Sequence, residues 1–142
     1  MKIVILDGTD DDLYRYVGPY AMSARHVRQN GNPITTSDKH RWYVEVDDKD
    51  RAQGFCSVKM SYNGLRRRIG NLVLPRDAKS FTPLIAQVIR EAVEAEAVLT
   101  AYVSDDKTEW FRRLGFRMMR QGVNWHVMGY KHDRTRSDDT EA

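Results

Sequence analysis

An amphipathic segment near the middle of the chain constrains the fold more than any other feature. Its apolar residues recur at spacings of three and one, which places them on one helical stripe: Phe81, Leu84, Ile85, Val88, Ile89, Ala92 and Val93. Thr82 is a good N-cap and Pro83 suits the first helical position. The apolar run at 98–103 then predicts a buried strand, so the helix belongs to a strand–helix–strand crossover.

Three strand-like segments precede this helix. They are Arg41–Val46, Ala52–Tyr62 and Leu65–Leu74. The second and third are separated by Asn63-Gly64, a strong signal for a two-residue hairpin in which both turn positions take positive φ. We therefore predict an antiparallel meander that leads into the crossover.

The N-terminal part predicts a strand over 2–6 and helical structure from Thr9 to about Gln29. Thr9 or Asp10 can cap the start, and Gly18-Pro19 is expected to break this stretch into two helices. The segment 31–38 has the composition of a loop.

After the buried strand, a short helix is predicted from Ser104 or Asp105 through Leu114. Gly115 fits the left-handed position that ends a helix. The region 116–131 then predicts a final strand, with Gly122 and Gly129 marking a bulge and a strand end. The element order predicts an α+β fold with a mixed sheet.

The length of 142 residues fits one domain, which we place at 1–132, with a disordered tail at 133–142. No apolar run approaches the roughly 20 residues of a membrane helix, and no signal peptide is recognisable. Cys56 is the single cysteine, and no cluster of metal-ligating residues is present. We expect a cytoplasmic protein with no metal and no membrane partner.

Basic residues are unevenly distributed, although the net charge is only +3. Arg66, Arg67 and Arg68 are consecutive, and four further arginines lie close together between 112 and 120. An anionic ligand, nucleic acid included, and a solvated surface explain these clusters equally well.

Three local features resemble the GNAT (Gcn5-related N-acetyltransferase) superfamily. The segment 70–75 (GNLVLP) is similar to that family's central strand, the amphipathic helix follows it directly, and 110–116 (WFRRLGF) is similar to an aromatic segment common in the family. Asn32-Pro33-Ile34 leading into Trp42 resembles short members encoded by phages and prophages, which implies the host cytoplasm as location.

The resemblance implies that the strands 68–74 and 98–103 splay apart and that acetyl-CoA, or another acyl-CoA, binds between them. Leu72, Val73 and Leu74 would offer backbone to the pantetheine arm. The pyrophosphate would lie at the helix N-terminus near Thr82, where the first N–H groups lack partners.

This chain departs from the family pattern in two places. The expected glycine-rich phosphate loop reads RDAKSFTP at 76–83, so phosphate would be met by a different set of residues: Arg76, Lys79, Ser80, Phe81 and Thr82. Phe111 stands where many members carry the tyrosine that protonates the leaving thiolate, and we expect it to line the cofactor site.

Other groups must therefore serve the chemistry. Tyr102 and Ser104, at the end of the second splayed strand, are the candidate proton donors, and Asn71 could orient a water molecule. Glu45, expected to face solvent, His26 and His40 are candidate proton acceptors.

Three functions remain open from the sequence. The first is an N-acetyltransferase that acts on a small-molecule or macromolecular amine. The second is a phage acyltransferase that modifies an amine of a nucleobase, and the third is a non-catalytic binding protein on the same scaffold. Both a monomer and a homodimer are compatible with the sequence.

Overall fold

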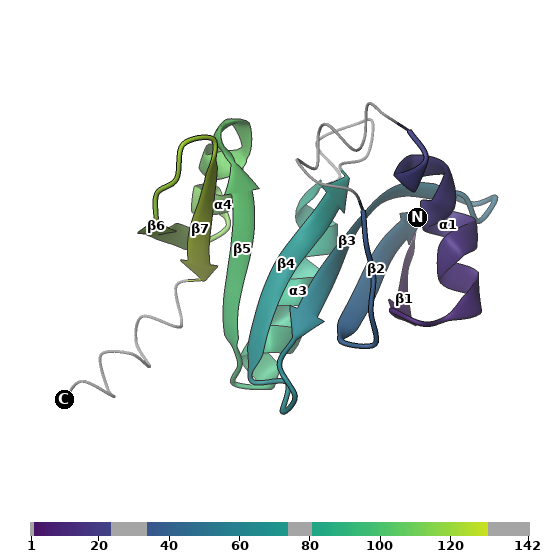
Figure 1. Cartoon of the computed structure of the whole chain (residues 1–142), viewed down its shortest axis with the longest axis horizontal. Coiled ribbons are helices and arrows are strands. Elements are labelled where there is room, and N and C mark those ends of the chain that lie inside the picture. The colour runs from purple at the N-terminus through teal and green to yellow at the C-terminus, as the bar shows by residue number, and fades with distance from the viewer. Residues whose placement is uncertain (1, 24–33, 74–80, 131–142) are drawn as a thin grey trace.

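The computed structural model describes residues 2–23, 34–73 and 81–130, which form one seven-stranded mixed sheet with helices on both faces (Figure 1). The strands are β1 (Lys2–Asp7), β2 (His40–Val46), β3 (Ala52–Met60), β4 (Arg66–Val73), β5 (Val98–Ser104), β6 (Phe116–Arg120) and β7 (Trp125–Tyr130). The helices are α1 (Asp11–Ala21), α3 (Phe81–Glu94), α4 (Thr108–Arg113) and the 3₁₀ turn η2 (Asp105–Lys107). The predicted α+β class is confirmed.

The sheet has the strand order β1-β2-β3-β4-β5-β7-β6. Strands β1 to β4 are antiparallel to their neighbours, which confirms the predicted meander. β4 and β5 run parallel and are connected through α3, as the predicted crossover requires, because parallel strands cannot be joined by a tight turn. β5, β7 and β6 then continue the sheet as antiparallel pairs.

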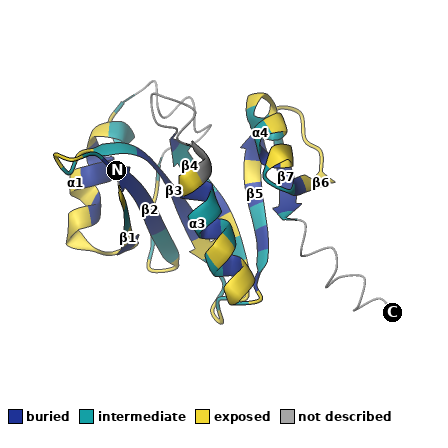
Figure 2. Cartoon of the chain, turned by 180° about the vertical axis from the view of Figure 1, so that it is seen from behind, coloured by how far each residue is buried: buried dark blue, intermediate teal, exposed yellow. Residues whose placement is uncertain are grey.

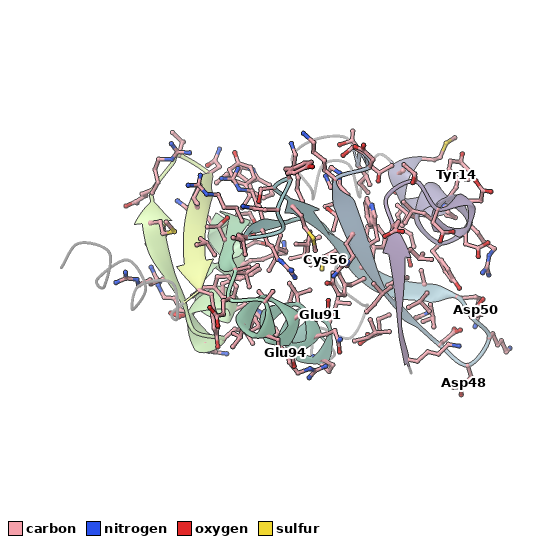
Figure 3. All side chains as sticks on the ribbon, turned by 90° about the horizontal axis from the view of Figure 1, so that it is seen from below. Tyr14, Asp48, Asp50, Cys56, Glu91 and Glu94 are labelled. Atoms are coloured by element: carbon pink, nitrogen blue, oxygen red, sulfur yellow. The ribbon has the colours of Figure 1, made fainter. Side chains whose placement is uncertain are left out.

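The two faces of the sheet carry separate hydrophobic clusters because strand side chains alternate. Trp42 and Val44 pack with α1 on one face, whereas Tyr43, between them, packs with α3 and Phe111 of α4 on the other. Figure 3 places α1 and α3 on opposite faces, and Figure 2 shows that α3 turns its buried stripe towards the sheet. α1 covers only the β1–β3 end, so within the described residues no helix lies above β4 and β5 on that face.

Helix α1 begins as predicted but is not broken. Asp10 is the N-cap, and its carboxylate accepts a hydrogen bond from the Asp12 N–H at 2.9 Å. The break predicted at Gly18-Pro19 is wrong, because the helix runs through both residues to Ala21. Pro19 is exposed and lies in the last turn, so it costs one backbone hydrogen bond close to the end of the helix.

The β3–β4 connection is longer than the predicted two-residue turn. Gly64 has φ +74°, but Asn63 does not have positive φ, and the loop closes with a Ser61 N–H to Arg66 O bond. The side chain of Asn63 accepts hydrogen bonds from Ser61 Oγ and the Leu65 N–H instead. The turn therefore uses the asparagine as a side-chain acceptor rather than for its tolerance of positive φ.

The C-terminal region differs from the single strand predicted over 116–131. It folds back on itself as the β6–β7 hairpin, and Gly122 lies in the connection. Gly129 lies within β7 rather than at its end. The Met119 side chain occupies the space where a Cβ atom of residue 129 would lie. Gly115, with φ +107°, ends α4 as predicted.

Several sequence predictions fall outside the described residues, among them the tail at 133–142 and His26. Among the described helices, none combines the length and the apolar character that crossing a membrane requires.

A buried polar contact fixes α3 to the sheet. The Tyr43 hydroxyl, on β2, donates a 2.5 Å hydrogen bond to Glu91 of α3, which also accepts from Gln87 at 2.7 Å and pairs with Arg41 at 3.3 Å. Burial by itself raises the pKa of the Glu91 carboxyl, but these three partners outweigh it and lower that pKa below its ordinary value.

We expect Tyr43→Phe to lower the free energy of unfolding by about 1–2 kcal/mol at pH 7, because a charge-assisted hydrogen bond is lost from a partly buried site. The pKa of Glu91 is lower in the folded protein than in the unfolded chain. The ionised carboxylate therefore stabilises the fold above pH 4.5, and this stabilisation is lost as the pH falls through the pKa of the folded state. The destabilisation should therefore shrink at pH 3. Urea unfolding at both pH values measures it, with the exposed Tyr14→Phe as control. An equal loss in both variants would contradict this role of Tyr43.

Candidate functional site

The sheet opens between β4 and β5. These strands pair only at their first residues, from Arg66–Val98 to Ile69–Ala101. Beyond that point β4 continues to pair with β3, and β5 pairs with β7 up to Ser104. The two strands diverge towards their carboxyl ends (Figure 1), as the family resemblance implied.

A β-bulge in β4 lies at the point of divergence. Between the pairs Ser57–Gly70 and Phe55–Val73, β4 has one residue more than β3. Asn71 takes the left-handed conformation, with φ +46°, which asparagine tolerates better than most residues. Its Nδ2 donates to Ser57 Oγ at 2.8 Å and to the Thr35 carbonyl at 3.0 Å, so the bulge is fixed from the β3 side.

A cavity of about 440 Å³ lies in the opening. Ser57 and Lys59 line it from the face opposite α3, because they alternate with Cys56 and Val58, which pack against that helix. Ile69, Val103 and Phe111 line it from the cluster that packs with α3, so the cavity extends between the two strands. Its lining comes from several strands and from the start of α4: Thr35, His40, Ser57, Lys59, Arg68, Ile69, Gly70, Asn71, Leu72, Tyr102, Val103, Ser104, Lys107, Phe111 and Trp125. A Cβ at Gly70 would meet no atom of the described residues within 4 Å, so these residues leave open space above this strand position.

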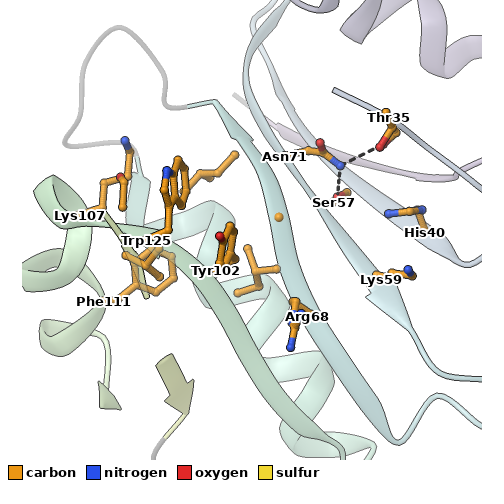
Figure 4. A pocket seen from close by; sticks show the side chains of 15 residues that line it. Thr35, His40, Ser57, Lys59, Arg68, Asn71, Tyr102, Lys107, Phe111 and Trp125 are labelled. Carbon is orange, nitrogen blue, oxygen red and sulfur yellow. Dashed lines mark hydrogen bonds between the residues drawn. The ribbon is translucent and has the colours of Figure 1, made fainter. Parts of the chain in front are cut away.

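One wall of the cavity is aromatic. The Tyr102 ring of β5 stacks on Trp125 of β7, with centroids 5.1 Å apart and planes 15° from parallel. Phe111 is 1% exposed and packs edge-to-face on Phe116. Among the described residues, the Tyr102 hydroxyl has no hydrogen-bond partner, and Figure 4 shows it beside the opening.

The opposite wall is polar and contains His40. Its Nδ1 lies 2.8 Å from Ser37 Oγ, which also accepts a bond from the Lys39 N–H at 3.2 Å. Burial, followed by the charge of Lys59, lowers the pKa of His40 below its ordinary value, so the ring is neutral at neutral pH. When Nδ1 donates its proton to Ser37 Oγ, Nε2 is an acceptor.

The end of β5 is held by polar contacts at the rim. Ser104 Oγ donates to Asp106 at 2.5 Å, which lowers the pKa of that carboxyl. His126 accepts the Gly122 N–H at Nδ1 and contacts Asp105 through Nε2, so the loop between β6 and β7 is tied to the end of β5.

The structure brings most of the described candidate residues to one place. Asn71, Leu72, Tyr102, Ser104 and Phe111 all line the cavity, as does His40. Val73 is buried at the end of β4 but does not line the cavity.

Glu45 does not join this group. It was expected to face solvent, but it is 3% exposed in β2, on the face that carries α3, and that expectation is wrong. Burial raises the pKa of its carboxyl. A strand buried on both faces breaks the polar–apolar alternation from which exposure was inferred.

The predicted phosphate residues are mostly outside the described part of the chain. Leu74, Arg76, Lys79 and Ser80 are not described, nor are the side chains of Phe81 and Thr82. α3 begins at Phe81, so Thr82 lies inside the helix rather than at its predicted cap. Cys56 is buried, and burial raises the pKa of its thiol to about 12, as expected of an inert packing residue.

Sequence reasoning missed four of the polar lining residues: Thr35, Ser57, Lys59 and Lys107. Arg68 was noted only as part of a basic run. For Ser57, Lys59 and Arg68, the alternation with buried neighbours along β3 and β4 is the signal that could have found them, once the strand register was known.

No protein-family model matches the sequence, and no curated protein is similar to it. Solved structures do match. Escherichia coli ElaA is 12% identical, with a TM-score of 0.71 over 91% of this chain and 98% of that protein. A GNAT-family acetyltransferase from Staphylococcus aureus is 9% identical, with a TM-score of 0.64 over the same shares, 91% and 98%.

An acyl-CoA N-acyltransferase from Pseudomonas aeruginosa is 12% identical, with a TM-score of 0.68 over 91% of this chain and 98% of that protein. At such identities the likeness concerns the arrangement of the backbone. This chain has the fold of the GNAT acetyltransferases, including the diverging strands at its centre.

Proposed function

We propose that this protein is an acyl-CoA-dependent N-acyltransferase that transfers an acetyl group from acetyl-CoA to an amine. The observation that carries the proposal is the cavity in the opening between β4 and β5, with a polar wall on one side and aromatic rings on the other. The fold shared with acyl-CoA N-acyltransferases supports it.

The residues around the opening fit an acyl-CoA. The bulge at Asn71 directs β4 away from β5, so Leu72 and Val73 have no partner in β5 and can pair with the amide groups of a pantetheine arm. α3 starts beyond the carboxyl end of β4, and its N-terminus suits a diphosphate. When bound, acetyl-CoA supplies the acyl thioester.

His40 is the proposed proton acceptor for the amine. It lines the cavity, its lowered pKa keeps it neutral, and Ser37 fixes the orientation of its ring. Asn71 is a positioning residue. Its side chain donates hydrogen bonds to Ser57 and to the Thr35 carbonyl, and these bonds fix the bulge.

Tyr102 is the proposed proton donor, in place of the tyrosine that the family resemblance would put at Phe111. Its hydroxyl lies on the cavity wall, whereas Phe111 has no proton to give. Ser104 is a weaker donor because its hydroxyl proton is held by Asp106. Glu45 has no part in this proposal, because it does not line the cavity.

A non-catalytic binding protein was the third possibility from the sequence, and side chains that fill the opening would have favoured it. The cavity above Gly70 argues against that alternative.

Isothermal titration calorimetry with acetyl-CoA tests the proposal. We expect saturable binding by the wild type, weakened about tenfold or more by Gly70→Leu, because the new side chain enters open space in the cavity. Val123→Leu, at a residue 90% exposed, is the matched control and should bind as the wild type does. Absence of binding to the wild type at millimolar acetyl-CoA would refute the function. Thermal unfolding verifies that Gly70→Leu is folded.

The pH dependence of kcat/KM tests His40. The acceptor amine and His40 must both be neutral. A plot of log(kcat/KM) against pH should therefore have a slope of about 2 below the His40 pKa and about 1 above it. Because that pKa is lowered, the change of slope should fall below pH 6.5. His40→Gln should lower kcat about 100-fold or more and give a slope of about 1 throughout. A change of slope that persists in His40→Gln would exclude this role.

A further inference from the structure

A row of basic side chains crosses the floor of the cavity. In the β2–β3 ladder His40 pairs directly with Lys59, and in the β3–β4 ladder Lys59 pairs directly with Arg68. Directly paired residues share one face of a sheet, with Cβ atoms about 4.5–5.5 Å apart. Figure 4 shows the three side chains on adjacent strands beside the opening.

Lys59 and Arg68 are two exposed cations on one face of the sheet, and an anion between them would relieve their mutual repulsion. Like charges directly opposite each other on a sheet repel, and within the described residues neither cation has an ion-pair partner. Arg68 makes only a long contact from Nε to Thr100 Oγ1, at 3.5 Å, which leaves its guanidinium fork open. Lys107, in contrast, contacts Asp106 at 3.5 Å.

The basic lining does not follow from the overall charge of the chain, which is only +3. No described residue that lines the cavity is acidic, although the chain has 20 Asp and Glu residues. The uncompensated cations are therefore a local property of the cavity, and a cavity with this charge attracts anionic ligands.

We propose that the acceptor amine of this enzyme is a small molecule that carries a carboxylate or phosphate group, bound by Lys59 and Arg68. The inference rests on the proposed acyltransferase function. Arg68 precedes Gly70 by two residues, about 6–7 Å along the strand, so the anion lies a few bonds from an amine placed at the bulge. Arginine can bind either oxyanion through two parallel hydrogen bonds, and lysine adds a point charge.

The test compares acceptors that differ only in the anion, with acetyl-CoA saturating. β-Alanine is compared with β-alaninamide, and ethanolamine phosphate with ethanolamine, using kcat/KM corrected to the neutral amine. We expect the anionic member of at least one pair to be preferred about tenfold or more by the wild type. The two pairs distinguish a carboxylate from a phosphate.

Charge-removing variants then locate the effect. Lys59→Gln/Arg68→Gln should abolish the preference for the anionic member of each pair, and this ratio is compared at a pH above 8, where His40 is neutral with or without Lys59. Arg117→Gln/Arg120→Gln removes the same charge from exposed positions of β6 and should keep the preference. Equal losses in both double variants, or equal rates for charged and neutral acceptors in the wild type, would overturn the inference while leaving the acyltransferase intact.

Two further measurements separate the remaining explanations. Calorimetry with inorganic phosphate, in the presence of saturating acetyl-CoA, should show binding that Lys59→Gln/Arg68→Gln weakens about tenfold. Loss of that binding when acetyl-CoA is added would assign the two cations to the cofactor and overturn the inference. The inference would also be overturned, in favour of a nucleic-acid acceptor, if the protein bound a short oligonucleotide with a steep salt dependence but bound no small anion. Acetylation of no amine at all would count against the proposed function itself.

Discussion

The bulge at Asn71 is the constraint on which the site depends. One additional residue in β4, in a left-handed conformation, turns the strand away from β5 just after their last pair, Ile69–Ala101. The side chain of the same residue anchors the bulge to Ser57 and to the Thr35 carbonyl. Without this irregularity a parallel ladder would continue to the ends of both strands, and the cavity would be replaced by ordinary sheet.

The rest of the fold supports that opening from both sides. α3 packs its apolar stripe behind β4 and β5 and is fixed to β2 by the Tyr43–Glu91 contact. The end of β5 is held by β7 and by the His126–Asp105 contact at the rim. Within the described residues, α1 covers only β1 to β3 on the face that carries Lys59 and Arg68. Most of the described residues that line the cavity belong to strands, which hold their side chains in defined positions.

The chemistry of the cavity differs between its walls. Tyr102 and Trp125 offer an aromatic surface from β5 and β7, whereas His40, Lys59 and Arg68 form a polar and basic row across β2, β3 and β4. A neutral imidazole beside two uncompensated cations suits an acceptor that must lose a proton at one end and is held by a negative charge at the other. The proposed proton acceptor and the proposed anion site are thus neighbours, and the charge of Lys59 helps to keep His40 neutral.

Local patterns in the sequence determined the elements. The stripe of α3, the N-cap at Asp10, the left-handed Gly115 and the order of meander and crossover are all short-range signals, and the structure contains each of them. Tertiary structure alone decided the exposure of Glu45 and the pairing of Lys59 with Arg68. It also decided the meeting of Tyr102 with Trp125. These three features depend on the register of the strands and on which faces of the sheet are covered. Contacts between residues far apart in the chain determine both the register and the covering. Periodicity can identify a strand, but it cannot say which strand will lie beside it or whether a helix will cover its face.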